Sequence, residues 1–314
     1  MRCLVAVVVL IGCEGAPAVP AHLEEVADIP QTGSDLPAAF DVDDTLVLMD
    51  NSTGLRRLVG DRLRSVSGGE SFSFGSIGVD RDGTLLLGSQ NTGQLARLEA
   101  NDVITNIAPQ PPSSFNKCTA VPSGAYHILQ FGAVNTLTLP LAGAAWVDSL
   151  RALDRTLLAP DGTIYAIENG DIVELDSTDA AATVASCAEF AGGTCPNLEL
   201  AGVDSAGHVH MAIPGLPDLH ILDPDSGSYR DIALPGGLEI VTMVSGTQHA
   251  LVMASDPDRD DERSLWLLED GSDELVRFTS LGAPFTLGFV RLLADHAGNT
   301  HVIASGKLSR VVVD

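Results

Sequence analysis

The chain of 314 residues is poor in basic side chains. Lysine and arginine together number 17 against 42 aspartates and glutamates, and only two lysines occur, Lys117 and Lys307. A surface this negative repels a phosphate backbone, which excludes nucleic acid as a partner. The same excess of negative charge suits an exported protein that avoids self-association, so we expect a monomer.

Long apolar runs and recognisable catalytic motifs are also missing. The one uninterrupted apolar run, from Cys3 to Ile11, is too short for a membrane span, which needs about 20 residues. The mature chain has no amphipathic helical stretch of useful length, no nucleophile elbow, no phosphate-binding glycine loop and no zinc-protease helix. We therefore name no catalytic residue from motifs.

The first residues, "MRCLVAVVVLIGCEGAP", have the features of a secretory signal: one positive residue followed by a short apolar run. The segment "LIGC" directly after that run resembles the bacterial lipobox, which implies a lipid on Cys13. The alternative is ordinary cleavage near "APA" at residues 16–18. We expect a lipoprotein signal at 1–12, a tether at 13–22 and one domain at 23–314. The expected location is the bacterial cell envelope, at the outer membrane or in the periplasm, with secretion as the alternative.

Three cysteines remain in the mature domain. Cys187 and Cys195 flank "AEFAGGT", a loop-like stretch in a chain sent to an oxidising space, where a disulfide between them is permitted. The alternative is two small buried side chains. Cys118 lies in a strand-like run and is expected to be a buried free thiol.

A repeat with a period of about 40 residues organises the domain. Its copies are "FDVDDTLVLMD", "VDRDGTLLLGS", "AVPSGAYHILQ", "LAPDGTIYAIE", "VDSAGHVHMAI", "MVSGTQHALVM" and "ADHAGNTHVIA", anchored at positions 44, 83, 124, 162, 207, 246 and 298. Each anchor is glycine except Asp44, which a turn tolerates because Asp can adopt left-handed conformations. This spacing is typical of one four-stranded propeller blade.

The unit at Gly162 predicts four strands: Thr156 to Pro160, Thr163 to Glu168, Asp171 to Asp176 and Ala182 to Ser186. We therefore predict an all-β protein, a seven-bladed β-propeller, with six or eight blades as alternatives. The last unit ends after three strands, and an open edge there would be unprotected. We predict that "EEVADIP", residues 24–30, supplies its outer strand and closes the ring.

The glycine-anchored pattern resembles the NHL and two-component-regulator families of bacterial propellers, most closely in "VDRDGTLLLGS" and "LAPDGTIYAIE". The resemblance covers most of residues 40–314. It implies a propeller fold and an interaction or sensing role, and it carries over no catalytic residue.

Histidines recur three positions after the anchors. The residues at this register are Val47, Leu86, His127, Tyr165, His210, His249 and His301. One interpretation is a ring of imidazoles that binds a metal or an anion. We favour the other, that a flat side chain packs here between blades, because packed sheets lie about 10 Å apart and zinc ligands only about 2 Å from the ion. His208 is expected to point to the opposite face from His210.

Two kinds of site are considered in the loops and the channel. Asp256, Asp258 and Asp260 in "DPDRDDER" have the spacing of calcium-loop ligands, but that loop's glycine and its bidentate Glu are missing, so the alternative is a solvated acidic loop. Propeller hydrolases of the gluconolactonase type hold a metal with carboxylates and an Asn on inner strands at the channel, and a resemblance to them would imply Asp41, Asn116 and Asp154 as candidates.

The leading functional hypothesis follows from the expected cellular location and fold. It is a lipid-anchored envelope propeller that binds a protein or glycan partner through its second-to-third and fourth-to-first strand loops, without a cofactor. The alternative is a lactonase-like or lyase-like enzyme with a divalent ion at the channel mouth.

Overall fold

A computed structural model of the chain describes residues 21–29, 37–50, 53–72, 75–80, 82–89, 94–107, 115–120, 125–130, 136–139, 145, 147–149, 153–159, 161–168, 170–176, 178, 180–187, 198–281 and 290–313. Some strand residues in these ranges have no described side chain. Cys13 and the expected signal and tether up to residue 20 lie outside this part of the chain. Among the residues described, no helix has the length and apolarity to cross a membrane.

The described chain is all-β, as predicted. Its strands form seven four-stranded antiparallel sheets. The first three sheets contain β2 (Ala38–Phe40), β3 (Leu46–Asp50), β4 (Gly54–Val59) and β5 (Arg62–Ser65); β6 (Gly75–Val79), β7 (Leu85–Ser89), β8 (Leu95–Leu98) and β9 (Ile104–Asn106); and β10 (Phe115–Ala120), β11 (Tyr126–Gln130), β12 (Thr136–Leu139) and β13 (Val147–Ser149).

The next three sheets contain β14 (Leu153–Leu158), β15 (Ile164–Glu168), β16 (Asp171–Leu175) and β17 (Ala181–Ser186); β18 (Glu199–Val203), β19 (Val209–Ala212), β20 (Asp218–Asp223) and β21 (Ser228–Ala233); and β22 (Glu239–Ser245), β23 (His249–Asp256), β24 (Arg259–Glu269) and β25 (Leu275–Leu281). The last sheet contains β26 (Val290–Ala294), β27 (Thr300–Ala304), β28 (Lys307–Val313) and β1 (Ala21–Asp28). Two short 3-10 turns cover Gly69–Phe72 and Pro235–Gly237.

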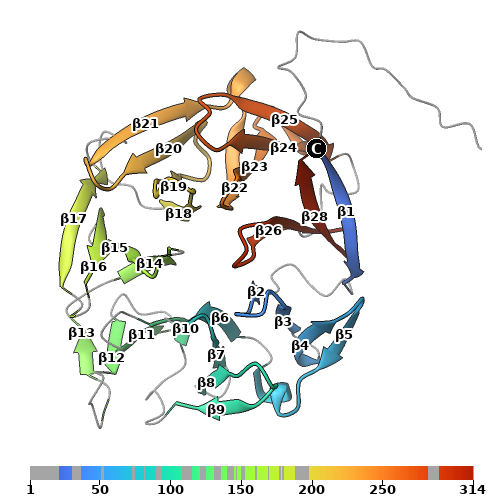
Figure 1. Cartoon of the computed structure of the whole chain (residues 1–314), viewed down its shortest axis with the longest axis vertical. Coiled ribbons are helices and arrows are strands. Elements are labelled where there is room, and N and C mark those ends of the chain that lie inside the picture. Colours follow the sequence, from blue (N-terminus) through green and yellow to red (C-terminus); the bar gives the residue numbers. More distant parts are fainter. Residues whose placement is uncertain are drawn as a thin grey trace, which may run out of the picture.

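The sheets are the blades of a β-propeller (Figure 1). Their innermost strands contact one another from β26 to β2, β6 and β10, and from β14 through β18 and β22 back to β26. The strands expected around Gly162 agree with β14 to β17 to within a few residues. Gly170, in the predicted two-residue turn, has φ 88°, a conformation that glycine adopts without steric cost.

The N-terminal strand closes the ring, as predicted. β1 pairs antiparallel with β28, from Ala21 opposite Val313 to Asp28 opposite Lys307. It is mostly exposed, and its glutamates Glu24 and Glu25 form ion pairs with Arg310 and Lys307. The last blade therefore combines the two ends of the domain, side by side in Figure 1.

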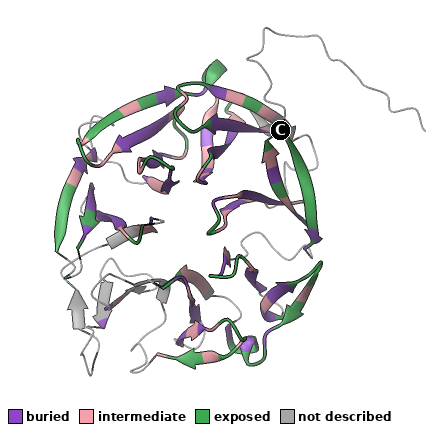
Figure 2. Ribbon diagram, in the orientation of Figure 1, coloured by how far each residue is buried: buried purple, intermediate pink, exposed green. Residues whose placement is uncertain are grey.

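The hydrophobic core lies between blades. One cluster joins Phe40 and Leu46 of the β2–β5 blade to Leu293 and Ile303 of the last blade, and similar clusters lie at other junctions between blades. Burying each such side chain stabilises the fold by roughly 1.5–3 kcal/mol. The second strands of the blades are accordingly buried, the innermost strands are half-buried and the outer strands are mostly exposed (Figure 2). Face-to-face packing of blades leaves the inner strands to line a central channel.

Candidate ligand site at the central channel

The turn between the first and second strand of a blade is the local structure on which the candidate site is built. In the blade β18–β21, Asp204 N donates to His208 O at 3.0 Å and Gly207 N donates to Asp204 O at 3.2 Å. This closes a tight loop in which the anchor residue has a positive φ, 91° at Gly207 and 55° at Asp44. The left-handed conformation explains why glycine recurs at the anchors, and Asp44 confirms the predicted tolerance for aspartate.

An aspartate begins this turn in four blades. Asp41, Asp80, Asp204 and Asp295 stand three residues before Asp44, Gly83, Gly207 and Gly298. In three of these turns, Oδ1 of the aspartate accepts backbone N–H groups of the turn, such as His208 N to Asp204 Oδ1 at 2.8 Å and Asn299 N to Asp295 Oδ1 at 2.7 Å. The side chain thus caps the loop, a common role of aspartate in turns.

The second carboxylate oxygen of each of these aspartates contacts a basic side chain or an imidazole. Asp41 is paired with Arg57 from the third strand, β4. Asp80 is paired with Arg97 from β8, with Nε and Oδ2 3.2 Å apart. Asp295 is bonded to His301 from the second strand, β27, with Nε2 and Oδ2 2.9 Å apart. These buried carboxylates are therefore compensated within their own blades, which burial of a charge requires.

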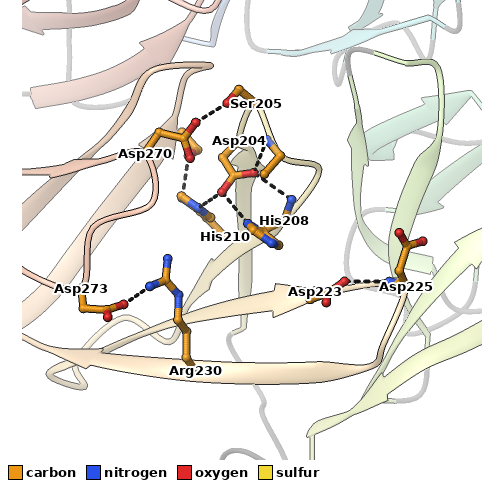
Figure 3. A network of polar contacts seen from close by, with 11 residues as sticks. Asp204, Ser205, His208, His210, Asp223, Asp225, Arg230, Asp270 and Asp273 are labelled. Atoms are coloured by element: carbon orange, nitrogen blue, oxygen red, sulfur yellow. Dashed lines mark hydrogen bonds and ion pairs between the residues drawn. The ribbon is translucent and has the colours of Figure 1, made fainter.

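Asp204 contacts two histidines at once (Figure 3). Its Oδ2 lies 2.9 Å from Nδ1 of His208 and 3.3 Å from Nε2 of His210. Burial alone would raise the pKa of the Asp204 carboxyl, but the hydrogen bonds from His210 and His208 hold that pKa well below its usual range. The expectation that His208 points away from His210 is wrong. His208 lies in the turn before β19, where the alternation of a strand does not apply.

His210 also reaches the next blade. Its Nδ1 lies 2.7 Å from Oγ of Ser245, the last residue of β22. Figure 3 shows two further polar contacts between the β18–β21 and β22–β25 blades near this cluster: Ser205 donates to Asp270, and Arg230 pairs with Asp273.

The other histidines of the predicted register pack between blades too. His249 Nε2 lies 2.6 Å from Thr300 Oγ1 of the last blade, and the His301 ring lies 4.5 Å from the ring of Phe40 of the first. His210, His249 and His301 are each less than 9% exposed. The packing interpretation is confirmed for these three; the side chain of His127 lies outside the described part. Within the residues described, no group of three or more His, Cys, Asp or Glu could hold a metal ion.

A cavity of about 660 Å³ opens at the end of the channel where these turns gather. Its walls include apolar side chains of inner strands, among them Phe40, Ile77, Leu158 and Leu293. Val42 and Val79, which are 46% and 36% exposed, lie in the same lining. The sequence predicts the site in the loops at the opposite end of the blades, but this cavity lies at the end where the turns between first and second strands gather.

The acidic stretch proposed as a calcium loop is a strand hairpin. Asp256 ends β23 and pairs with Arg259, the first residue of β24, so only two residues connect the strands. Asp258 lies in this turn, where its N–H donates to Asp256 Oδ1 at 2.9 Å. Asp260 belongs to β24, and its side chain is not described. The sequence predicts a long loop at residues 256–263, and this prediction is wrong, because the pairing of β23 with β24 continues through these charged residues.

The remaining candidates are only partly described. Cys187 is buried directly after β17, and Cys195 lies outside the described residues, so their disulfide stays a prediction. Asn116 and Asp154 are in β10 and β14 without described side chains. Asp41 is not open to a metal as proposed, because Arg57 holds it. The sequence analysis missed the capping aspartates, although "D-x-x-G" stands in three of its aligned copies, at Asp80, Asp204 and Asp295.

The fold places the protein among β-propellers. No family model matches the chain, and no curated protein matches it. Among solved structures it is similar to virginiamycin B lyase from Staphylococcus aureus, with a TM-score of 0.64 and 9% identity over 94% of this chain and 100% of that one. YCF48 bound to D1 peptide matches with a TM-score of 0.60 and 12% identity over 96% and 99%.

The extracellular domain of a putative hybrid two-component system from B. thetaiotaomicron is similar as well. It matches with a TM-score of 0.60 and 13% identity over 92% of this chain and 42% of that one. At these identities the likeness concerns the fold alone. The neighbours differ in what their names describe, and function must be argued from this chain's own residues.

Proposed function

We propose that this protein is a binding propeller of the bacterial cell envelope that takes an apolar segment of a partner protein into the channel cavity. The observation that carries the proposal is the cavity itself, with apolar inner-strand walls and the half-exposed Val42 and Val79 in its lining. Concave, mostly apolar sites with a few polar groups are the usual form of ligand pockets. A solved neighbour, YCF48, is named as bound to a peptide, which supports a protein-binding role for this fold.

The state of the carboxylates supports binding over metal-dependent catalysis. Asp80 and Asp295 line the cavity, but Arg97 holds the first and His301 and Asn299 hold the second. A divalent ion in the channel would have to displace these partners. A lactonase-like or lyase-like enzyme with such an ion therefore fits these residues less well than a binding site, and a glycan partner fits an apolar wall less well than a protein does.

The location rests on the leader. A lipid on Cys13, a tether that ends where β1 begins at Ala21, and a disulfide between Cys187 and Cys195 remain part of the proposal. The extracellular neighbour from B. thetaiotaomicron is consistent with a location in the cell envelope. Incorporation of radiolabelled palmitate should be lost in Cys13→Ala. Label retained by that variant would contradict the anchor.

A peptide library displayed on phage tests the binding site. We expect panning on the immobilised protein to enrich peptides with apolar side chains that bind Val42→Arg at least about 100-fold more weakly, because the longer side chain fills the pocket and sets a charge against its apolar wall. Val103→Arg is the matched control, since Val103 is 49% exposed and outside the cavity lining. Enriched peptides that bind both variants like the unmodified protein would contradict the proposal.

A further inference from the structure

We propose that Ser245 is a nucleophile in the channel cavity, activated by His210 and Asp204, and that it accepts acyl groups from small uncharged apolar esters. The proposal uses the cavity of the proposed function as its substrate site. Ser245 is one of the cavity-lining residues, although it is only 6% exposed. Its Oγ is 2.7 Å from His210 Nδ1, and His210 Nε2 is 3.3 Å from Asp204 Oδ2. A hydroxyl, an imidazole and a carboxylate in this order form a catalytic triad.

The hydrogen bonds fix the direction of proton transfer. An ionised carboxylate can only accept, so Nε2 of His210 must carry the proton that bonds Asp204. In the neutral imidazole, Nδ1 then has the free lone pair, and the Ser245 hydroxyl donates to it. His208 bonds the same carboxylate oxygen and helps to hold it in place. The imidazole is thereby oriented as a general base toward the hydroxyl of Ser245, which lines the cavity.

The neighbouring histidines show that this arrangement is not a general property of the repeat. His249 bonds a hydroxyl of the next blade, that of Thr300, but Met243 stands where Asp204 stands relative to His210. Thr300 is fully buried and outside the cavity lining. His301 has the aspartate but packs at a tilt against the ring of Phe40 where His210 meets a serine. Of these three histidines, only His210 contacts both a carboxylate and the hydroxyl of a residue that lines the cavity.

The reaction that these groups can perform is acyl transfer. Oγ of Ser245 bonds the ester carbonyl carbon while its proton moves to His210 Nδ1. The carbon–oxygen bond to the alcohol then breaks, and the departing oxygen takes that proton. Water attacks the acyl-serine by the same route and releases a carboxylic acid. Substrates without charge are expected because the walls are apolar and the lining contains no Lys or Arg.

Turnover is expected to be slow, so the test measures the covalent step. The N–H groups of Gly246 and Thr247 already donate to His249 O and Gly298 O, at 2.9 and 3.1 Å. They do not serve the oxyanion, and loss of one such donor costs about 100-fold to 1,000-fold in rate. An alkyl fluorophosphonate reports the nucleophile alone: Ser245 Oγ bonds phosphorus, fluoride departs and the serine proton leaves with it.

The experiment is labelling of the full mature chain with this probe, read by peptide mass spectrometry. We expect one label on Ser245, no label there in Ser245→Ala, and a rate about 100-fold lower in His210→Gln, the usual effect of losing a general base. His249→Gln is the matched control at the same register and should label like the unmodified protein.

The outcomes separate this proposal from the binding function. No label on Ser245 in the folded protein, or an unchanged labelling rate in folded His210→Gln, would overturn the nucleophile. Peptides selected on the cavity would still bind in that case. A label on Ser245 without any peptide binding that depends on Val42 would instead overturn the protein-binding function and leave the nucleophile standing.

Discussion

The blades hold their turn aspartates in two different ways. In the first two blades an arginine of the third strand reaches the aspartate, Arg57 to Asp41 and Arg97 to Asp80. In the blade β18–β21 and in the last blade, a histidine of the second strand does so, and the first of these is His210 to Asp204. The same turn therefore has either a permanently charged partner or a titratable one.

The cross-strand register explains the exchange. Val47 and Leu86, which occupy the histidine register in the first two blades, lie directly opposite Arg57 and Arg97. An aliphatic residue at this register is thus accompanied by an arginine beside it. In the blade β14–β17 the aspartate is replaced by Ala159, and Tyr165 occupies the register, where burial and nearby acids such as Glu174 raise the pKa of its hydroxyl to about 12. The lesson is that the repeat requires compensation of the carboxylate, not a particular residue.

Removal of an arginine partner should give the largest effect. Arg57→Met leaves the Asp41 carboxylate, which is 2% exposed, without its cation. We expect a loss of about 3–5 kcal/mol in the free energy of unfolding, the usual cost of breaking a buried ion pair from one side. Urea denaturation at pH 7 measures it.

The exposed ion pair at the ring closure provides the control. Arg310→Met breaks the pair with Glu24, whose side chains are 44% and 52% exposed, and should cost less than about 1 kcal/mol. Addition of Asp41→Asn to Arg57→Met should restore part of the stability. Equal losses of stability in the Arg57 and Arg310 variants would show that the buried ion pair of Arg57 with Asp41 contributes no more than an exposed one.

The repeat made most of the fold predictable. Glycine or aspartate at each anchor indicated the turns, and the β-rich units between them indicated the blades. The missing outer strand of the last unit led to the correct partner for β1, because an open sheet edge is unfavourable. These are local or topological constraints, and they can be read from spacing.

The candidate site was less predictable because it depends on contacts between blades. Ser245 lies 35 residues after His210, and their contact requires the rotation of one blade against the next. Strand alternation predicts the wrong side for the His208 side chain, because the turn extends through His208 and β19 begins only at Val209. The acidic residues 256–263 suggested a loop, but hairpin ends in solvent tolerate charge, and pairing of β23 with β24 decided the structure. Alignment of the third strands as well as the second strands would have revealed the arginines that pair with the turn aspartates.

Acid should weaken the histidine-tied turns in a specific way. The pKa of the Asp204 carboxyl is lower in the folded protein than in the unfolded chain, so its contribution to stability is present above the unfolded value of about 3.9 and is lost as pH falls through the folded value. We expect Asp204→Asn to be less stable than the unmodified protein at pH 6 and to lose less stability between pH 4 and pH 2.5. Urea midpoints across this range check it; parallel curves for the two proteins would contradict the assignment.

His249 tests the same comparison with a histidine that has no carboxylate as hydrogen-bond partner, and its substitution should have the smallest effect on stability. Burial lowers the pKa of its imidazole, and its hydrogen-bond partner is the neutral Thr300, whereas His210 and His301 face carboxylates. Below the unfolded pKa of about 6.5, His249 binds a proton in the unfolded chain but stays neutral in the folded protein. The free energy of unfolding therefore falls as pH decreases, by about 1.4 kcal/mol for each unit by which folding lowers the pKa. We expect His249→Phe to remove this part of the dependence between pH 7.5 and pH 5.5, while His301→Phe leaves it in place, as measured by urea unfolding. If both substitutions changed the slope equally, the distinction between a histidine beside a hydroxyl and one beside a carboxylate would fail.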